Sequence, residues 1–432
     1  MQVNEKNFPY HTTTPANETI TLQNQTKWLI NTLQQKQNWE KVRLEEVSKF
    51  IRGVVYSKDD ELEINNGLVI LRSNNVDFTT NKLNFENLKF VKQSVKAKKE
   101  QCLIKDDVLI SVSNSKEQTG KVAFSNQNTT FYVGGFMAIL RPQNVNPYFF
   151  FLMLLTDNFK NFIASRNQGT TNIWNITFDR IRDYAIHLPP LPIQQQIADL
   201  LWSIEDQITA TQQTQTTLQQ LKKKLLHQLF SPSLTDNNNS LLFTLQKEDF
   251  KQVKFGEVVR HVKEKADYQT LKRFVAGEHM ETDELQIKQW GEITEDTVLG
   301  SAFCTKFKAG QILYGSRRTY LRKVAIAHFE GVCANTTFIL EPMDANILNR
   351  DYLAFMMQGE VFATYSINNS KGSTNPYINF TDLQPFEFNL PSIDKQIATA
   401  TLLNHLEHCL QEAAALLVAL QGLKKGLINS LM

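Results

Sequence analysis

The sequence predicts a mixed α+β protein made of two copies of one globular unit, each copy followed by a long helix. Three observations support this fold class. The second half of the chain repeats residues of the first half at an offset of about 202 positions, each repeat ends in apolar residues at helical spacing, and short apolar runs between turn residues fill the rest. The chain of 432 residues is long enough for several domains.

These patterns divide the chain into segments. The polar run SPSLTDNNNS between the two copies indicates a linker, because such residues mark loops rather than packed elements. The expected segments are a polar N-terminal extension (1–34), a first globular domain (35–187), a first helix (188–230), a linker (231–248), a second globular domain (249–389) and a second helix (390–432).

The globular units are predicted from short apolar runs bounded by turn signals, which are typical of strands. The clearest runs in the first copy are Gly67–Leu71, Asp107–Ile110, Gly120–Phe124 and Phe136–Leu140. The segment Pro147–Phe162 has a helical pattern instead. Each unit should therefore combine a substantial amount of sheet with helix.

The repeat is clearest at the end of each copy, where residues 188–230 align on residues 390–432 without a gap. Upstream, GTTN at Gly169–Asn172 corresponds to GSTN at Gly372–Asn375, and a Lys-Val-Ala tripeptide occurs in both copies. Because these matches follow the same order in both halves, they indicate a duplication rather than chance.

Both helices are predicted from apolar residues that recur every three or four positions, as the narrow seam of a coiled coil requires. Proline lies just before each helix, at Pro189 and Pro391, where its missing N–H is not needed. The residues assigned to the seam, or to an interface with another subunit, are Leu201, Ile204, Ile208, Leu218, Leu221, Leu225, Leu403, Leu406, Leu410, Leu417, Leu420 and Leu427.

Composition and missing motifs exclude several classes of function. The 46 basic and 44 acidic residues leave a net charge of +2, so any nucleic-acid surface must be a local patch. The four cysteines form no CxxC pair, which disfavours a disulfide framework or a zinc site. No GxxxxGK[ST], GxGxxG or HExxH motif occurs, so no catalytic site, cofactor or metal is assigned. Without a signal-peptide pattern or an apolar run of about 18 residues, we expect a cytoplasmic protein.

Two local patterns have both a functional and a structural interpretation. His405, His408 and Cys409 lie within one predicted helical turn and have metal-ligand chemistry, but the seam leaves them on the flank of the helix. NPYF at 146–149 and NPY at 375–377 resemble the NPPY motif of amino-methyltransferases but lack its second proline. We interpret the first pattern as solvent-exposed side chains and the second as a turn leading into a helix.

The whole arrangement resembles the specificity (S) subunits of type I restriction–modification enzymes. The resemblance rests on the proline-rich helix start Leu188–Pro192 followed by Gln194, and on its copy Leu390-Pro391 followed by Gln396. The GTTN and GSTN loops and the order globe, helix, globe, helix also match that family. The glutamate that usually precedes the glutamine is absent from both copies.

The resemblance implies that each globular unit is a target-recognition domain that reads one half of a split DNA sequence. The helices would form an antiparallel coiled coil that acts as a ruler, with the two copies related by a pseudo-twofold repeat. Because the two units differ in sequence, the target should be asymmetric. The chain itself would be non-catalytic. It would dock methyltransferase (M) subunits and, indirectly, motor-nuclease (R) subunits, which use S-adenosylmethionine, ATP and Mg²⁺.

Basic, polar and aromatic side chains near predicted strand ends are the candidates for contact with double-stranded DNA. The segment Tyr314–Lys323 holds four cations and two tyrosines, although a solvated hairpin is the structural alternative. The candidate residues are Arg72, Ser73, Asn74, Lys89, Lys92, Lys96, Lys98, Lys99, Lys121, Gly169, Thr170, Asn172, Tyr314, Ser316, Arg317, Arg318, Tyr320, Arg322, Lys323, Gly372 and Asn375.

Three other functions are compatible with the same sequence. A specificity subunit of a type IIB-like system would differ only in its partner genes. A degenerate DNA methyltransferase or nuclease would be expected to bind S-adenosylmethionine by itself. A coiled-coil adaptor with two protein-binding globes would not bind DNA.

Overall fold

The structure is a computed structural model, and it describes residues 38–77, 80–166, 168–169, 174–230 and 250–431. The chain forms two compact units: unit 1 comprises Met1–Ala210 and Leu417–Met432, and unit 2 comprises Thr211–Leu416. Each of the two long helices therefore contributes one part to each unit. The predicted extension at 1–34 and linker at 231–248 lie outside the described residues.

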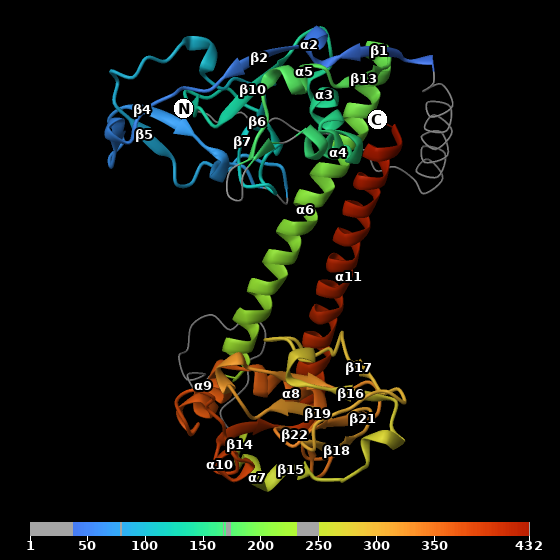
Figure 1. Cartoon of the computed structure of the whole chain (residues 1–432). Coiled ribbons are helices and arrows are strands. Elements are labelled where there is room, and N and C mark those ends of the chain that lie inside the picture. The colour runs from blue at the N-terminus through green and yellow to red at the C-terminus, as the bar shows by residue number, and fades with distance from the viewer. Residues whose placement is uncertain (1–37, 78–79, 167, 170–173, 231–249, 432) are drawn as a thin grey trace, which may run out of the picture. The chain divides into compact units, whose positions relative to one another are not determined.

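Unit 1 is a mixed α+β unit (Figure 1). Its strands pair in the orders β1-β13, β2-β10-β6-β8, β3-β5-β4-β9 and β11-β12-β7. The strands are β1 (Glu40–Arg43), β2 (Ser48–Arg52), β3 (Glu61–Leu62), β4 (Leu68–Leu71), β5 (Lys89–Val91), β6 (Val108–Ser111), β7 (Ser113–Asn114), β8 (Val122–Phe124), β9 (Tyr132–Val133), β10 (Met137–Pro142), β11 (Gln168–Gly169), β12 (Trp174–Asn175) and β13 (Ala185–Leu188). The helices are α2 (Leu44–Val47), η2 (Lys58–Asp60), η3 (Ser73–Asn75), η4 (Lys99–Gln101), α3 (Pro147–Met153), α4 (Asp157–Arg166), α5 (Phe178–Arg182) and parts of α6 (Leu191–Phe230) and α11 (Ile393–Leu431).

Unit 2 has the strand orders β14-β23, β15-β22-β19-β20 and β17-β16-β21-β18. Its strands are β14 (Phe250–Lys254), β15 (Val259–Val262), β16 (Arg273–Val275), β17 (Gly291–Glu292), β18 (Phe303–Phe307), β19 (Ile312–Gly315), β20 (Val324–Ile326), β21 (Gly331–Ala334), β22 (Thr337–Pro342) and β23 (Glu387–Pro391). Its other helices are α7 (Phe255–Val258), η6 (Tyr268–Thr270), η7 (Gly277–His279), η8 (Thr319–Leu321), α8 (Arg350–Gln358), α9 (Glu360–Asn368) and α10 (Phe380–Leu383).

The two units share the topology of their central sheet, which confirms the predicted duplication. The antiparallel sheet β2-β10-β6-β8 of unit 1 recurs as β15-β22-β19-β20 in unit 2. The central register is also the same, because Ile139 lies opposite Leu109 and Ile339 lies opposite Leu313. The parallel pair β4–β9 recurs as β16–β21. The predicted mixture of sheet and helix is therefore present twice.

The long helices complete the core of each unit. In unit 1, Leu201 near the start of α6 shares a buried cluster with Ile428 and Leu431 at the end of α11. In unit 2, Leu225 near the end of α6 shares a cluster with Leu403 near the start of α11. Within each unit the start of one helix thus packs with the end of the other, which is the antiparallel pairing that the resemblance implied.

The predicted seam is largely buried, with one correction. Leu221 is 43% exposed. Its neighbour Lys222, which is 9% exposed, takes the position that faces Glu407 of the other long helix. The buried seam residues are Leu201, Ile204, Ile208, Leu225, Leu403, Leu406 and Leu420, and the half-buried ones are Leu218, Leu410, Leu417 and Leu427.

The helix predicted at Pro147–Phe162 is two helices, α3 and α4. Asn146 caps α3, since its side chain accepts from Phe149 N–H at 2.8 Å, as expected for the turn interpretation of NPYF. The break follows from Thr156, whose hydroxyl donates to the Met153 carbonyl at 2.8 Å and accepts from Phe159 N–H at 3.2 Å. In the described part of the chain, no helix combines the length and apolar character needed to cross a membrane.

Candidate nucleic-acid interface

A basic loop of unit 2 connects β19 to β20. The loop is closed as a hairpin, because Gly315 N–H donates to the Lys323 carbonyl at 2.9 Å. Arg318 and Arg322 have left-handed φ angles of 52° and 49°, and they flank the single turn η8. The exposed side chains of this loop are Arg317, Arg318 and Tyr320.

The GSTN segment lies against the same loop. Arg318 Nε donates to Asn375 Oδ1 at 2.8 Å, and Arg318 N–H donates to the Pro376 carbonyl at 2.6 Å. The Arg317 guanidinium lies 5.8 Å from the centre of the Tyr377 ring. Tyr377 is 38% exposed and was not a predicted contact. We refer to Arg317, Arg318, Tyr320, Asn375 and Tyr377 as the unit 2 loop surface.

Two candidates from the same segment are buried instead. Tyr314 is 3% exposed, and its hydroxyl hydrogen-bonds with that of Ser366. Burial raises the pKa of Tyr314 to about 12, so its hydroxyl stays neutral. Ser316 Oγ donates to the Thr336 carbonyl at 2.7 Å. Their assignment as DNA contacts is corrected, because both side chains point into the strand layer that supports the loop.

Arg322 and Lys323 also support the loop. Arg322 Nη1 donates to Glu360 Oε2 at 2.7 Å, and its Nε lies 3.1 Å from Asp283 Oδ1 as an ion pair rather than an aligned hydrogen bond. Lys323 Nζ donates to the Gly277 carbonyl. These contacts within unit 2 hold the loop in position, and the DNA contacts of Arg322 and Lys323 remain predictions.

Unit 1 holds an equivalent loop between β6 and β8. Ile176 N–H donates to the Val112 carbonyl at 2.9 Å, and Ile378 N–H donates to the Ser316 carbonyl at 2.9 Å in unit 2. The segment that follows each GxTN motif is therefore attached to the loop by the same backbone bond. The two loops are anchored alike at their base, but the unit 1 loop contains β7 and the unit 2 loop contains η8.

The unit 1 loop presents different side chains. The Lys116 ammonium is exposed and lies 5.2 Å from the centre of the Trp174 ring. We refer to these two residues as the unit 1 loop surface. Neither was predicted. The signal was available in the repeat, since each copy has a cation before its Lys-Val-Ala strand and an aromatic residue soon after its GxTN segment.

The glycines of the two GxTN segments have different places in the structure. Gly372 has a φ of +88°, a conformation that favours glycine, so it shapes the turn before Asn375. Gly169 lies in β11, opposite Trp174. Thr170 and Asn172 lie outside the described residues.

Lys121 is a buried side chain rather than a surface contact. It is 8% exposed, and burial lowers its pKa to about 8, while the charge of Asp77 acts in the opposite direction. The burial of Lys121 argues against its predicted contact with DNA.

The turn after β4 places Arg72, Ser73 and Asn74 as predicted, near a strand end. Arg72 N–H donates to Asn75 Oδ1 at 2.9 Å, and in unit 2 Ala276 N–H donates to His279 Nδ1 at 3.1 Å. The two turns are equivalent but present different side chains, Arg-Ser-Asn in unit 1 and Ala-Gly-Glu in unit 2. Asn74 is exposed, whereas the other two unit 1 residues are half-buried.

The predicted lysines at positions 89–99 of unit 1 lie among acidic residues. Lys89 forms an ion pair with Glu61. Glu100 is held by Lys49 at 2.7 Å. The neighbouring carboxylates weaken the field of the run. The exposed lysines of the run are Lys92, Lys96, Lys98 and Lys99.

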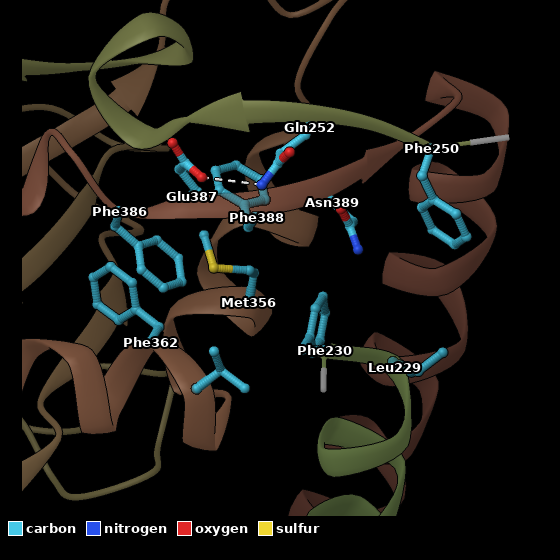
Figure 2. A pocket seen from close by; sticks show the side chains of 11 residues that line it. Leu229, Phe230, Phe250, Gln252, Met356, Phe362, Phe386, Glu387, Phe388 and Asn389 are labelled. Atoms are coloured by element: carbon cyan, nitrogen blue, oxygen red, sulfur yellow. Dashed lines mark hydrogen bonds between the residues drawn. The ribbon is translucent and has the colours of Figure 1, made fainter. Parts of the chain in front are cut away.

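A cavity of about 150 Å³ in unit 2 lies beside the end of α6 (Figure 2). Most of the residues that line it are apolar, and Gln252 Nε2 donates to Glu387 Oε2 at 3.0 Å. Gln252 and Glu387 therefore already hydrogen-bond with each other. His405, His408 and Cys409 are exposed on α11. Within the described ranges, no group of three or more His, Cys, Asp or Glu residues could hold a metal ion.

The comparisons with known proteins agree on one family. The family model of the type I restriction modification DNA specificity domain matches residues 36–220 and 247–414. The chain is 26% identical over 296 residues to the type I restriction enzyme EcoDI specificity subunit of Escherichia coli, covering 61% of this chain and 65% of that protein. It is 27% identical over 228 residues to the putative type I restriction enzyme MjaX specificity subunit of Methanocaldococcus jannaschii, covering 51% and 50%. The matches span half to two thirds of these relatives' length.

Two solved structures share the fold. The type I restriction–modification system S subunit from M. genitalium has a TM-score of 0.58 and 14% identity, covering 91% of this chain and 96% of that chain. A chain from a structural study of complex assembly and conformational transition of the type I R-M system has a TM-score of 0.55 and 16% identity, covering 91% and 97%.

Proposed function

We propose a function from one premise: this chain belongs to the family of type I restriction modification DNA specificity domains, whose model matches it twice. We infer that it is the non-catalytic recognition subunit of a type I restriction–modification complex. Each unit reads one half of a bipartite, asymmetric sequence in double-stranded DNA.

One observation carries this proposal: equivalent loops are anchored by the same backbone bonds at their base and differ at their exposed side chains. The unit 2 loop surface offers Arg317 and Arg318, and arginine suits bidentate contact with the O6 and N7 atoms of guanine. The unit 1 loop surface offers Lys116 beside Trp174, a different donor set. Loops at the same place in each unit with different exposed side chains suit two half-sites of different sequence.

The contacts that hold the two arginine side chains in place support their role in base contact. The bond from Arg318 to Asn375 and the ring of Tyr377 beside Arg317 restrict the guanidinium groups before DNA arrives. A restricted donor loses less conformational freedom on binding, so more of its interaction energy contributes to affinity. Tyr320, 51% exposed, is suited to a phosphate or sugar contact at the same surface.

The partners follow from the same family membership. The curated relatives are named specificity subunits of type I restriction enzymes. We infer that methyltransferase subunits dock on this chain and that motor-nuclease subunits join through them. S-adenosylmethionine, ATP and Mg²⁺ would be used by those partners.

The test is the methylated motif of cells that express the full chain with its methyltransferase subunits. Arg317→Ala combined with Arg318→Ala should relax one half of the motif and leave the other half unchanged, with about 1–3 kcal/mol of discrimination lost per bidentate contact. Lys116→Ala should affect only the opposite half.

Arg260→Ala is the matched control, because Arg260 is an exposed arginine of the same unit that pairs with Glu341 on β22. It should leave the whole motif unchanged. An unaltered motif in the Arg317→Ala and Arg318→Ala double variant would remove the unit 2 loop surface from the proposal. Absence of any sequence-specific methylation by the wild-type complex would contradict the function itself.

A further inference from the structure

Each unit has a turn with an unusual backbone at the same position of the repeat. Asn81 of unit 1 and Asp283 of unit 2 are 202 residues apart, which is also the offset between the two Lys-Val-Ala strands. Both are left-handed, with φ angles of 57° and 56°. This conformation is costly for most residues with a side chain, and asparagine and aspartate tolerate it better than others. We refer to the turns at Asn81 and Asp283 as the bridging turns.

In unit 1 the bridging turn links the ion pair of the long helices to the end of the loop between β6 and β8. Asn81 Nδ2 donates to the carbonyl of Val122, the first residue of β8, at 3.1 Å. The next residue, Lys82, lies 2.8 Å from Glu205 of α6, which also pairs with Lys424 of α11. Two consecutive residues of the turn therefore hold the end of the loop on one side and the helices on the other.

In unit 2 the bridging turn makes the same link through different groups. Lys222 of α6, which pairs with Glu407 of α11, donates to the Asp283 carbonyl at 2.8 Å. Asp283 Oδ1 lies 3.1 Å from Nε of Arg322, at the end of the loop between β19 and β20. Because the Asp283 side chain is 51% exposed, this ion pair can orient Arg322 but adds little to the stability of unit 2.

The link recurs although its individual bonds do not. In unit 1 a lysine of the turn pairs with a helix carboxylate, whereas in unit 2 a lysine of the helix donates to a carbonyl of the turn. The turn side chain donates to a backbone carbonyl in unit 1 and pairs with an arginine in unit 2. Two different sets of bonds with one result indicate that both units use the link itself. A loop that contacts bases needs such support, because small displacements lose the contact.

We propose that Asn81 and Asp283 are positioning residues for sequence recognition. Each ties the loop of its own unit to the ion pair between α6 and α11, and so holds the loop surface of that unit where it contacts bases. The inference rests on the proposed function, and it assigns specificity-determining residues that lie outside both loop surfaces.

The experiment measures initial rates of DNA methylation by the full chain in complex with its methyltransferase subunits. The duplexes carry the recognised motif or one altered base in either half, and the readout is the ratio of the two rates for each half. Asp283→Gly should lower the ratio for one half by about two- to fivefold. It should leave the thermal unfolding temperature nearly unchanged, because glycine adopts the left-handed angle freely.

Asn81→Asp has nearly the same shape and tolerates the same backbone, but it cannot donate to the Val122 carbonyl. It should lower the ratio for the other half by about two- to tenfold. Asn144→Asp is the matched control, because Asn144 is another left-handed asparagine of unit 1, exposed in the turn after β10. It should leave both ratios unchanged. Asp283→Asn keeps a side-chain oxygen at Arg322, so its ratio should lie between those of the wild type and Asp283→Gly.

The ratios separate positioning from a purely structural role. A variant that is only less stable methylates every duplex more slowly and keeps its ratios, and that result for both Asp283→Gly and Asn81→Asp would overturn the inference. Equal loss of discrimination in the two halves would also overturn it, because each turn contacts the loop of its own unit alone. A wild-type complex that methylates all duplexes at the same rate would contradict the proposed function instead.

Discussion

Two buried glutamines attach the long helices to the units they leave. Gln194 Oε1 accepts from Asn146 N–H at 2.8 Å, and its Nε2 donates to the Pro189 carbonyl at 2.7 Å. Gln396 makes the same two bonds: its Oε1 accepts from Asn349 N–H at 2.8 Å, and its Nε2 donates to the Pro391 carbonyl at 2.8 Å. Each amide therefore joins the start of a long helix to the cap of the helix that follows the sheet, a contact that needs both a donor and an acceptor.

Gln194→Leu should destabilise unit 1 by about 2–4 kcal/mol, because it leaves two buried backbone groups without partners in a site of nearly unchanged volume. Urea unfolding followed by hydrogen exchange in unit 1 would measure the loss. Gln195→Leu is the control, since Gln195 is exposed and should change stability by less than about 0.5 kcal/mol. Equal effects of the two substitutions would contradict the attachment role.

His261 makes the stability of unit 2 depend on pH. Its ring lies 4.7 Å from Phe338 and 5.3 Å from Phe380, and burial, followed by the charge of Lys263, lowers its pKa to about 4. A histidine whose folded pKa is below its unfolded value of about 6.5 stabilises the fold in its neutral form. That contribution is complete above about pH 6.5 and is lost as the pH falls toward 4.

His261→Phe should reduce this acid sensitivity, because the equivalent residue of unit 1 is Phe50, which lies opposite Leu140 as His261 lies opposite Leu340. Thermal unfolding of the wild type and the variant between pH 7.5 and pH 5 checks it. The variant should lose less thermal stability over that interval. Parallel curves for the two proteins would show that His261 does not control the transition.

At the scale of the helices, two ion pairs join α6 to α11. Lys222 Nζ lies 2.5 Å from Glu407 Oε1 in unit 2, and Lys424 Nζ lies 2.6 Å from Glu205 Oε2 in unit 1. The residues occupy the same positions of the repeat. Burial disfavours the charged form of Glu205, but hydrogen bonds from Lys424 and Lys82 outweigh it and hold its pKa below the usual value. Lys82 lies 2.8 Å from Glu205.

Lys222→Met should cost unit 2 about 3–5 kcal/mol, because it leaves the Glu407 carboxylate buried and unpaired. Lys222→Met combined with Glu407→Met should recover most of that loss. Lys424→Met is the internal comparison, and it should cost less, since Glu205 keeps Lys82. Chemical denaturation of the three variants measures the differences, and an equal cost for both single substitutions would contradict the assignment.

At the scale of the whole molecule, repetition and periodicity predicted the duplicated α+β fold and both helices. They did not distinguish Leu221 from Lys222, because a spacing of three or four allows either neighbour to face inward and the pairing with Glu407 decides it. Composition identified the basic segment of unit 2. It could not separate Arg317, which is exposed in the loop, from Tyr314, which lies in β19, where Ile312, Leu313 and Tyr314 are all buried.

Removal of residues 417–432 should destabilise unit 1 rather than unit 2. The deletion takes Leu420, Ile428 and Leu431 from the unit 1 core, and each such side chain contributes roughly 1.5–3 kcal/mol when buried. Hydrogen exchange should accelerate in the strands of unit 1 and stay unchanged in unit 2. Val418→Ala is the control, because Val418 is 70% exposed on the same stretch of helix. Faster exchange confined to unit 2 would contradict the division of the chain.

Unit 1 is assembled from two stretches of chain with the whole of unit 2 between them. During synthesis its sheets emerge from the ribosome first, but the helix end that covers Leu201 and Ile204 emerges only after unit 2, roughly 10–20 s later at the faster rates of translation. The domain that begins folding first is thus the last to be finished, and throughout that interval the nascent protein exposes an apolar helix face that chaperones can bind.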